Sequence, residues 1–232
     1  MQNNLAIDGE NRFNDEQFGN PEFDDARCYI SRTARITGRV KIENDVIICP
    51  HVSLRADEGS PFYIGAGTNI QDSVIFHGLI NKFFEVAGVK YSVYVGSECT
   101  IAHRALVHGP AVLGNNSFIG FNAIFHGSRA GEHTFIDFNA TVKNATLGNY
   151  CHIGIGAIVS GVTITDHSYL TDGMVVTDQA VADGLPKTPE KIAEGDDHFN
   201  KEVVEFNKEL RERYYLRRQA KEKRLQEQGI SQ

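Results

Sequence analysis

The chain has 232 residues, of which 41% are hydrophobic and 23% charged, as in an ordinary globular protein. Its formal net charge of −7 argues against nucleic acid or an anionic membrane as a partner. No apolar run could span a bilayer, residues 1–27 do not resemble a signal peptide, and the four cysteines form no CxxC pair. We therefore expect a cytoplasmic protein with one main domain.

Residues 1–27 are acidic, rich in asparagine and without a hydrophobic period, which predicts a polar N-terminal arm. From residue 28 onward a large apolar residue recurs at every sixth position, with a few five-residue steps. A small or β-branched residue stands four positions after most of them. Cys99 and Cys151 fall on that small position, so we interpret both as core residues rather than metal ligands. The large residues are Ile30, Ile36, Ile42, Ile48, Leu54, Ile64, Ile70, Phe76, Val95, Ile101, Val107, Leu113, Ile119, Phe125, Ala130, Ile136, Val142, Leu147, Ile153, Val159, Ile164, Leu170 and Val176.

This six-residue period predicts the fold of residues 28–178. A helix cannot keep residues six apart on one face, and a regularly alternating strand would leave no such gap. A short strand and a turn every six residues, with three strands to a coil, satisfy the period. We therefore predict an all-β domain: a parallel β-helix of hexapeptide repeats, shaped as a triangular prism with the large residues inside.

Two insertions interrupt the repeat. The step from Leu54 to Ile64 is ten residues long and carries Glu58, and the step from Phe76 to Val95 is nineteen residues long. Insertions in repeat proteins map to loops on one side of the molecule and often carry function. Both loops are therefore candidates for the functional site.

After Val176 the period stops. Residues 179–232 are predicted to form a polar linker and a highly charged helix, which we expect to run from about Phe199 to Gln228. An apolar stripe on that helix is expected to pack against the prism.

Histidines mark one column of the predicted prism. Repeat positions that are three apart lie one above another on successive coils and so form a column. His77 and His108 each follow a residue of the same column, so they lie on adjacent coils, about 4.8 Å apart. Two imidazoles at that spacing can bind one metal ion. His126 continues the column one coil higher and could be a surplus ligand, a supporting group or, as we favour, a stacked surface residue.

A third ligand requires a second chain. His103 stands about five residues along the wall from the pair, on the order of 15 Å away within one chain. A neighbour rotated about a threefold axis could supply it, so a three-histidine site implies a homotrimer. The same rotation would bring Arg55, below His77, toward Asp72, below His103, as an ion pair between subunits.

The segments that carry these residues resemble a known family. They are RADEGSP (55–61), NIQD (69–72), HG (77–78), AH (102–103) and VHGP (107–110). Together they resemble gamma-class carbonic anhydrases and the related gamma-carbonic-anhydrase-like domain of the carboxysomal shell-organising protein. The resemblance runs from about Ile30 to Leu210.

The resemblance implies a left-handed β-helix, a homotrimer and a metal ion between subunits, which would be zinc, iron(II) or cobalt(II). The implied ligands come from two neighbouring chains: His77 and His108 from one, and His103 from the other. By the same matching, Glu58 would relay protons, Gln71 would hydrogen-bond near the metal-bound water, and Asn207 would help to position carbon dioxide. The implied activity is the reversible hydration of CO2 to bicarbonate by metal-bound hydroxide.

Three departures from the family pattern leave alternatives open. Ile80 replaces a loop glutamate, the loop is shorter and less acidic, and the run from Phe125 to Val176 holds about one coil more. Ile80 favours an alternative function, a catalytically weak or inactive protein that binds bicarbonate or serves as a scaffold. A hexapeptide acyltransferase shares the coil, but it would not need stacked histidines.

Overall fold

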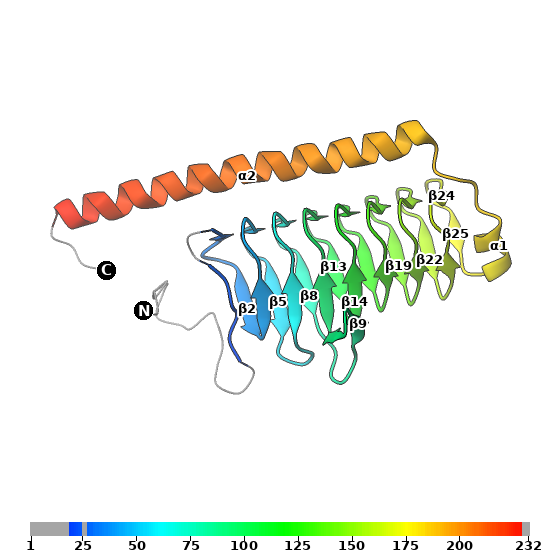
Figure 1. The fold of residues 1–232 in the computed structure, drawn as a ribbon, viewed down its shortest axis with the longest axis horizontal. Helices are drawn as coiled ribbons and strands as arrows, with labels where there is room; N and C mark the ends of the chain where they lie inside the picture. The colour runs from blue at the N-terminus through cyan, green and yellow to red at the C-terminus, as the bar shows by residue number, and fades with distance from the viewer. Residues whose placement is uncertain (1–18, 25–26, 229–232) are drawn as a thin grey trace.

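The computed structural model describes residues 19–24 and 27–228, so most of the predicted arm lies outside the described residues. Three parallel sheets of eight, seven and eight strands form the walls of a triangular prism in this part of the chain (Figure 1). The prediction of a left-handed β-helix of hexapeptide repeats with a C-terminal helix is confirmed. Within the described range, no helix has the length and apolar character needed to cross a membrane.

We call the three sheets walls A, B and C. Wall A contains β2 (Arg35–Gly38), β5 (Ser53–Ala56), β8 (Ile75–His77), β13 (Leu106–His108), β16 (Ile124–His126), β19 (Thr141–Lys143), β22 (Ile158–Ser160) and β25 (Val175–Val176). Wall B contains β3 (Val40–Ile42), β6 (Phe62–Ile64), β11 (Val93–Val95), β14 (Ala111–Leu113), β17 (Arg129–Ala130), β20 (Thr146–Leu147) and β23 (Thr163–Ile164). Wall C contains β1 (Tyr29–Ile30), β4 (Ile47–Ile48), β7 (Asn69–Ile70), β12 (Thr100–Ile101), β15 (Phe118–Ile119), β18 (Phe135–Ile136), β21 (His152–Ile153) and β24 (Tyr169–Leu170).

The repeat residues fill the inside of the prism. Ile36, Leu54 and Phe76 of wall A are completely buried, one above the other. Burying each such side chain contributes about 1.5–3 kcal/mol, so the stacked coils hold one another together. Cys99 and Cys151 are buried in the same core, as predicted.

The turn between walls C and A places two of the predicted site residues. Ser73 and Arg104 occupy this turn on adjacent coils with φ values of +62° and +61°. The Arg104 N–H donates to the Asp72 carbonyl at 3.0 Å, which ties the two turns together. His103 therefore lies directly above Asp72.

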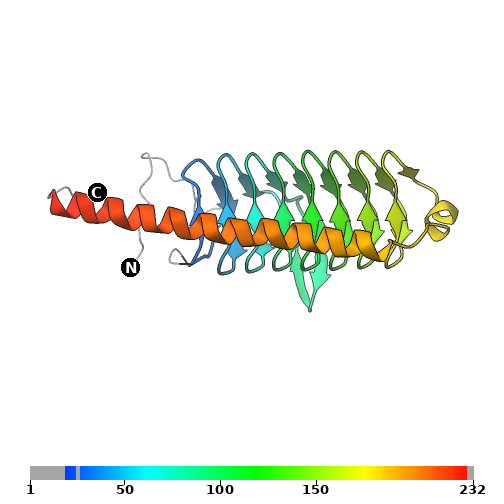
Figure 2. The ribbon, with the colours of Figure 1, turned by 90° about the horizontal axis from the view of Figure 1, so that it is seen from above.

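The nineteen-residue step contains a hairpin that we predicted only as a loop. Strands β9 (Phe84–Val86) and β10 (Val89–Tyr91) pair in antiparallel fashion and project from the prism (Figure 2). Ala87 and Gly88 form the turn between them, both with positive φ, as two-residue hairpin turns require. The insertion after His77 is thus a folded β-hairpin rather than an irregular loop.

The C-terminal helix starts earlier than we predicted. A short helix α1 (Gln179–Asp183) is followed by α2 (Glu190–Glu227), which begins directly after Pro189 rather than near Phe199. The first turns of α2 carry no apolar period; contacts with wall C, such as Asp196 with His152 at 2.7 Å, hold them in place. Helix α2 lies along wall C and extends beyond its first coil (Figures 1 and 2).

Candidate metal centre

The two histidines of the predicted column lie together at the end of wall A. His77 closes β8, His108 closes β13, and the two residues are paired in register. Their ring centroids are 5.0 Å apart and the rings are nearly perpendicular, at 84°. The spacing predicted from the repeat is therefore confirmed, and it suits two imidazoles that bind one ion.

His126 continues this column, with its ring 4.6 Å from that of His108. Burial, together with His108 and Lys143 nearby, lowers the pKa of the His126 imidazole. His126 therefore stacks on the column at the edge of the wall, as we favoured from the sequence.

Two loops in close contact place Glu58 beside His77. Side chains at Gly59 or Gly78 would collide with the backbone of the other loop, so only glycine allows the two loops to pack this closely. The Gly78 N–H also donates to the Arg55 carbonyl at 3.0 Å. As a result, Glu58 Oε1 lies 3.3 Å from His77 Nε2, without a hydrogen bond between them.

Arg55 lies directly below His77 in wall A, as the columns predicted. Its guanidinium donates to Asp57 at 3.0 Å and lies 3.7 Å from Glu58. Burial alone would raise the pKa of Asp57, but the hydrogen bond and charge of Arg55, together with hydrogen bonds from the backbone of Asp57 and Glu58, lower the pKa overall. Within one chain Arg55 thus orders the loop that carries Glu58, and its contact with Asp72 of a neighbour stays a prediction.

Unsatisfied polar atoms concentrate around the predicted site residues, mostly at this edge. Buried polar side-chain atoms nearly always have hydrogen-bond partners, so the exceptions indicate places where another group completes them. Five of the seven such atoms found in the described residues belong to the predicted site or to the loops around it. They are Asp57 Oδ1, Gln71 Oε1, His77 Nε2, Ser92 Oγ and His108 Nδ1.

The donor set fits a divalent metal ion such as zinc. Each histidine of the pair has one buried ring nitrogen without a partner, and neutral imidazole nitrogen is an ordinary zinc ligand. Cys49 does not compete as a ligand, because burial and the nearby Asp72 raise its pKa to about 12 and keep the thiol protonated.

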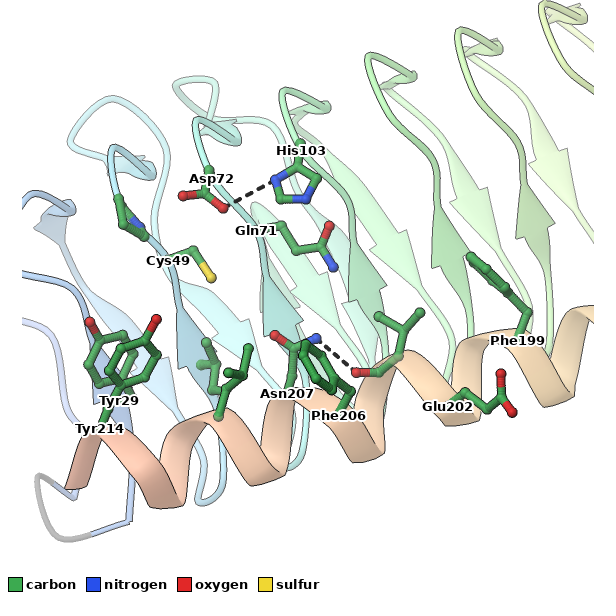
Figure 3. A pocket seen from close by; sticks show the side chains of 14 residues that line it. Tyr29, Cys49, Gln71, Asp72, His103, Phe199, Glu202, Phe206, Asn207 and Tyr214 are labelled. Atoms are coloured by element: carbon green, nitrogen blue, oxygen red, sulfur yellow. Dashed lines mark hydrogen bonds and ion pairs between the residues drawn. The ribbon is translucent and has the colours of Figure 1, made fainter. Parts of the chain in front are cut away.

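The second group of predicted residues lies at the opposite edge of wall A. His103 Nδ1 is 3.2 Å from Asp72 Oδ2, and both side chains are about half exposed. They line a cavity of about 450 Å³ between wall C and α2 (Figure 3). Gln71 and Asn207 line the same cavity, so it holds four of the eight predicted site residues.

The two amides in this cavity are held by different contacts. Gln71 Nε2 donates to Asn69 Oδ1 at 3.3 Å, and the buried Asn69 donates in turn to Thr100 at 2.9 Å. Asn207 is 6% exposed, and its Nδ2 donates to the Val203 carbonyl one turn earlier in α2 (Figure 3). Both amides therefore have fixed positions in the cavity that His103 also lines.

The predicted site is thus divided between two edges of one wall. His103 precedes His108 by five residues and lies in the turn before β13, whereas His108 ends that strand. No group of three metal-ligating side chains forms within the described part of a single chain. A three-histidine centre needs a second chain, and the meeting of the two edges stays a prediction.

Sequence reasoning missed two features of this region. Ser92 is completely buried, and a side chain at either Gly59 or Gly109 would contact its hydroxyl, so it packs beneath both site loops. The hairpin was missed as well, although alternating residues around an Ala-Gly pair are a recognisable signal.

Comparisons with known proteins agree with the sequence motifs. No family model matches the chain. A carbonic anhydrase from Methanosarcina thermophila is 38% identical over 117 residues, which cover 46% of this chain and 47% of that protein. The carboxysome assembly protein CcmM from Nostoc sp. is 47% identical over 107 residues, which cover 45% of this chain and 19% of that protein. The chain thus matches less than half the length of these curated relatives.

A solved structure supports the fold alone. The crystal structure of a hexapeptide transferase family protein from Anaplasma phagocytophilum has a TM-score of 0.52 and 20% identity, covering 84% of this chain and 92% of that one. At that identity the likeness extends to the coil and not to the chemistry. From the sequence comparisons, this chain is similar to the gamma-class carbonic anhydrase family.

Proposed function

We propose that this protein is a metal-dependent lyase that catalyses the reversible hydration of CO2 to bicarbonate in the cytoplasm. The observation that carries the proposal is the pair of adjacent imidazoles, each with a buried nitrogen that has no partner, beside a half-exposed carboxylate. His77 and His108 of one subunit and His103 of the next would hold one zinc, iron(II) or cobalt(II) ion.

The metal ion, when bound, would make hydroxide available at neutral pH by lowering the pKa of a water molecule. Glu58 is placed to accept the proton that this water loses, because its carboxylate lies 3.3 Å from His77 and is half exposed. Because the Glu58 side chain is half exposed, it can pass the proton on to solvent. Hydration of CO2 releases one proton for each bicarbonate, so this transfer is required in every cycle.

The amides of the neighbouring subunit would orient the reactants. The Gln71 amide is fixed through Asn69, and its buried Oε1 has no partner, so it can accept a hydrogen bond from the attacking water. Asn207 projects from α2 into the same cavity and would help to position CO2. Both depend on a second chain to meet the His77–His108 pair.

An exposed apolar stripe on wall A supports the trimer. Ile75, Ile124, Ile158 and Val175 are between 38% and 57% exposed, and their strands stand in register along the outside of this wall. A stripe of this kind on an exposed face indicates a contact with another protein surface. Wall A carries the two halves of the site at its edges, so packing of this wall around a threefold axis would join them.

A second candidate function keeps the metal and the trimer without catalysis. Ile80 occupies the loop position three residues after His77 and is 69% exposed, so this position offers no second carboxylate for proton transfer. A bicarbonate-binding or scaffold protein would tolerate that loss. A hexapeptide acyltransferase remains a weaker alternative, because the only feature it explains is the coil.

Stopped-flow CO2 hydration by anaerobically purified protein, combined with metal analysis, tests the proposal. We expect about one metal ion per chain and hydration activity that His103→Ala abolishes. Full metal loading without hydration would favour the scaffold protein. A monomeric protein without bound metal would contradict both candidates.

A further inference from the structure

The loop that follows His77 exposes apolar side chains close to the site. Ile80 is 69% exposed and Phe83 is 38% exposed. Ile80 is only three residues from His77, so their Cα atoms are at most about 11 Å apart. Apolar residues held in water beside a polar site indicate a surface that another protein covers.

Contacts on both strands fix the hairpin that follows this loop. The Arg129 guanidinium lies over the Phe84 ring, 4.8 Å from its centroid, and donates to the Glu85 carbonyl at 2.9 Å. On the other strand of the hairpin, the Tyr91 ring packs 5.4 Å from that of Tyr94 on wall B. The hairpin is therefore fixed at both strands, and the exposed Ile80 and Phe83 lie in the short segment between His77 and its first strand.

A matching apolar surface lies on α2, which packs along wall C. Phe206 and Phe199 of α2 are 55% and 41% exposed, and both line the cavity that contains His103 (Figure 3). Phe206 adjoins Asn207 in the chain. Each half of the site thus has its own pair of exposed apolar side chains.

We propose that Ile80 and Phe83 of one subunit pack against Phe206 and Phe199 of its neighbour. This apolar contact would close the site on one side. The occupant is a second copy of this chain, because the metal centre is incomplete without one and the two apolar pairs flank its two halves. This inference rests on the proposed function, since the trimer that joins His103 to His77 and His108 also brings these surfaces together.

This apolar contact between subunits affects which molecules can enter the cavity. CO2 is small and apolar, and it loses little on leaving water, whereas an anion that enters an apolar opening loses hydration without compensation. The apolar contact therefore favours CO2 over charged solutes at this entrance. Glu58, on the polar loop beside Ile80, is left as the carboxylate that exchanges protons with solvent.

Cysteine cross-linking tests the contact. The variant Ile80→Cys/Phe206→Cys is made in a Cys49→Ser background, because Cys49 lines the same cavity. After mild oxidation we expect three chains joined covalently on a non-reducing denaturing gel. The matched control leaves Ile80 in place and changes Val181, which is 45% exposed on α1, so that Val181→Cys/Phe206→Cys should stay uncross-linked.

The outcomes separate this inference from the proposed function. A metal-loaded trimer in which the two introduced thiols of Ile80→Cys/Phe206→Cys fail to cross-link would overturn the inference and leave the proposed function standing. A monomer without metal would overturn the proposed function itself. As a second measurement, Ile80→Ser/Phe83→Ser should raise the trimer dissociation constant at least tenfold, whereas Val181→Ser should leave it unchanged.

Discussion

The edges of wall A and the seam between wall C and α2 both contain histidines, but the histidines have different surroundings. At the seam, His152 contacts Asp196 at 2.7 Å and His133 contacts Asp197 at 3.0 Å. At the edge of wall A, His77 and His108 each have a buried ring nitrogen without a partner. The seam histidines hydrogen-bond to carboxylates of the same chain, whereas neither ring of the column pair does, and the Glu58 carboxylate lies 3.3 Å from His77 without a hydrogen bond.

This difference distinguishes the column pair from the histidines of the seam without reference to any relative. A buried donor or acceptor without a partner costs about 1–3 kcal/mol, so it persists where something else completes it. We therefore expect mutations at the two regions to have opposite consequences, loss of metal at one and loss of stability at the other.

The largest effect is expected for His77→Ala. Removing one of the three proposed ligands should reduce bound metal to near zero and lower kcat/KM for CO2 hydration by roughly 10³-fold or more. The melting temperature of the metal-free protein should hardly change, because His77 Nε2 makes no hydrogen bond within the chain. Metal analysis, stopped-flow hydration and thermal unfolding measure the three quantities.

The matched control is His198→Ala. His198 pairs with Glu202 on the exposed face of α2, with side-chain exposures of 72% and 66%. This variant should keep its metal, its activity and its melting temperature. A His77→Ala protein that retained metal and activity would show that the column pair is not the metal centre.

The sequence predicted the β-helix and the column pair because both follow from a local period. Once Phe76 and Val107 are assigned to the inside of adjacent coils, His77 and His108 must be neighbours, and the observed register agrees. The same reasoning placed Arg55 below His77. A repeat converts sequence position into spatial position, so residues far apart in the chain can be paired by counting.

The seam could not be predicted in this way. His152 and Asp196 are separated by 44 positions, and His133 and Asp197 by 64, with no period that connects them. These contacts fall in the first turns of α2, which show no apolar stripe. Individual side-chain contacts between the repeat region and a helix outside it produce no periodic pattern in a single sequence, so they cannot be found by counting.

A smaller effect is expected at the seam for His152→Ala. The change leaves Asp196, whose side chain is 17% exposed, without its partner, and it removes the ring stacked between Phe135 and Tyr169. We expect a loss of about 2 kcal/mol in the free energy of unfolding, measured by urea denaturation. Hydration activity per bound metal should stay unchanged.

His152→Phe sharpens this test because it keeps the stacked ring and removes only the hydrogen bond. It should lie between wild type and His152→Ala in stability. If both variants unfolded at the wild-type urea concentration, the His152–Asp196 pair would not anchor α2. His198→Ala again serves as the exposed control.

The smallest effect is expected at the other end of the seam, where Asp45 meets Arg211 of α2 and Arg27. Burial pushes the pKa of Asp45 up, but the hydrogen bonds from Arg211 and Arg27 outweigh it, and the net pKa lies below its ordinary value. A carboxylate with a lowered folded pKa stabilises the fold above its unfolded pKa of about 3.9, and that contribution is lost as the pH falls through the folded value.

Asp45→Asn should therefore cost stability at pH 7, by about 1 kcal/mol or less because the pair is partly exposed. The difference from wild type should persist at pH 5 and shrink below pH 4, where the wild-type carboxylate takes up its proton. Urea denaturation of both proteins at pH 7, 5 and 3 measures it. Only the wild-type carboxylate changes its charge over this pH range. A stability difference independent of pH would therefore mean that Asp45 holds α2 through packing alone.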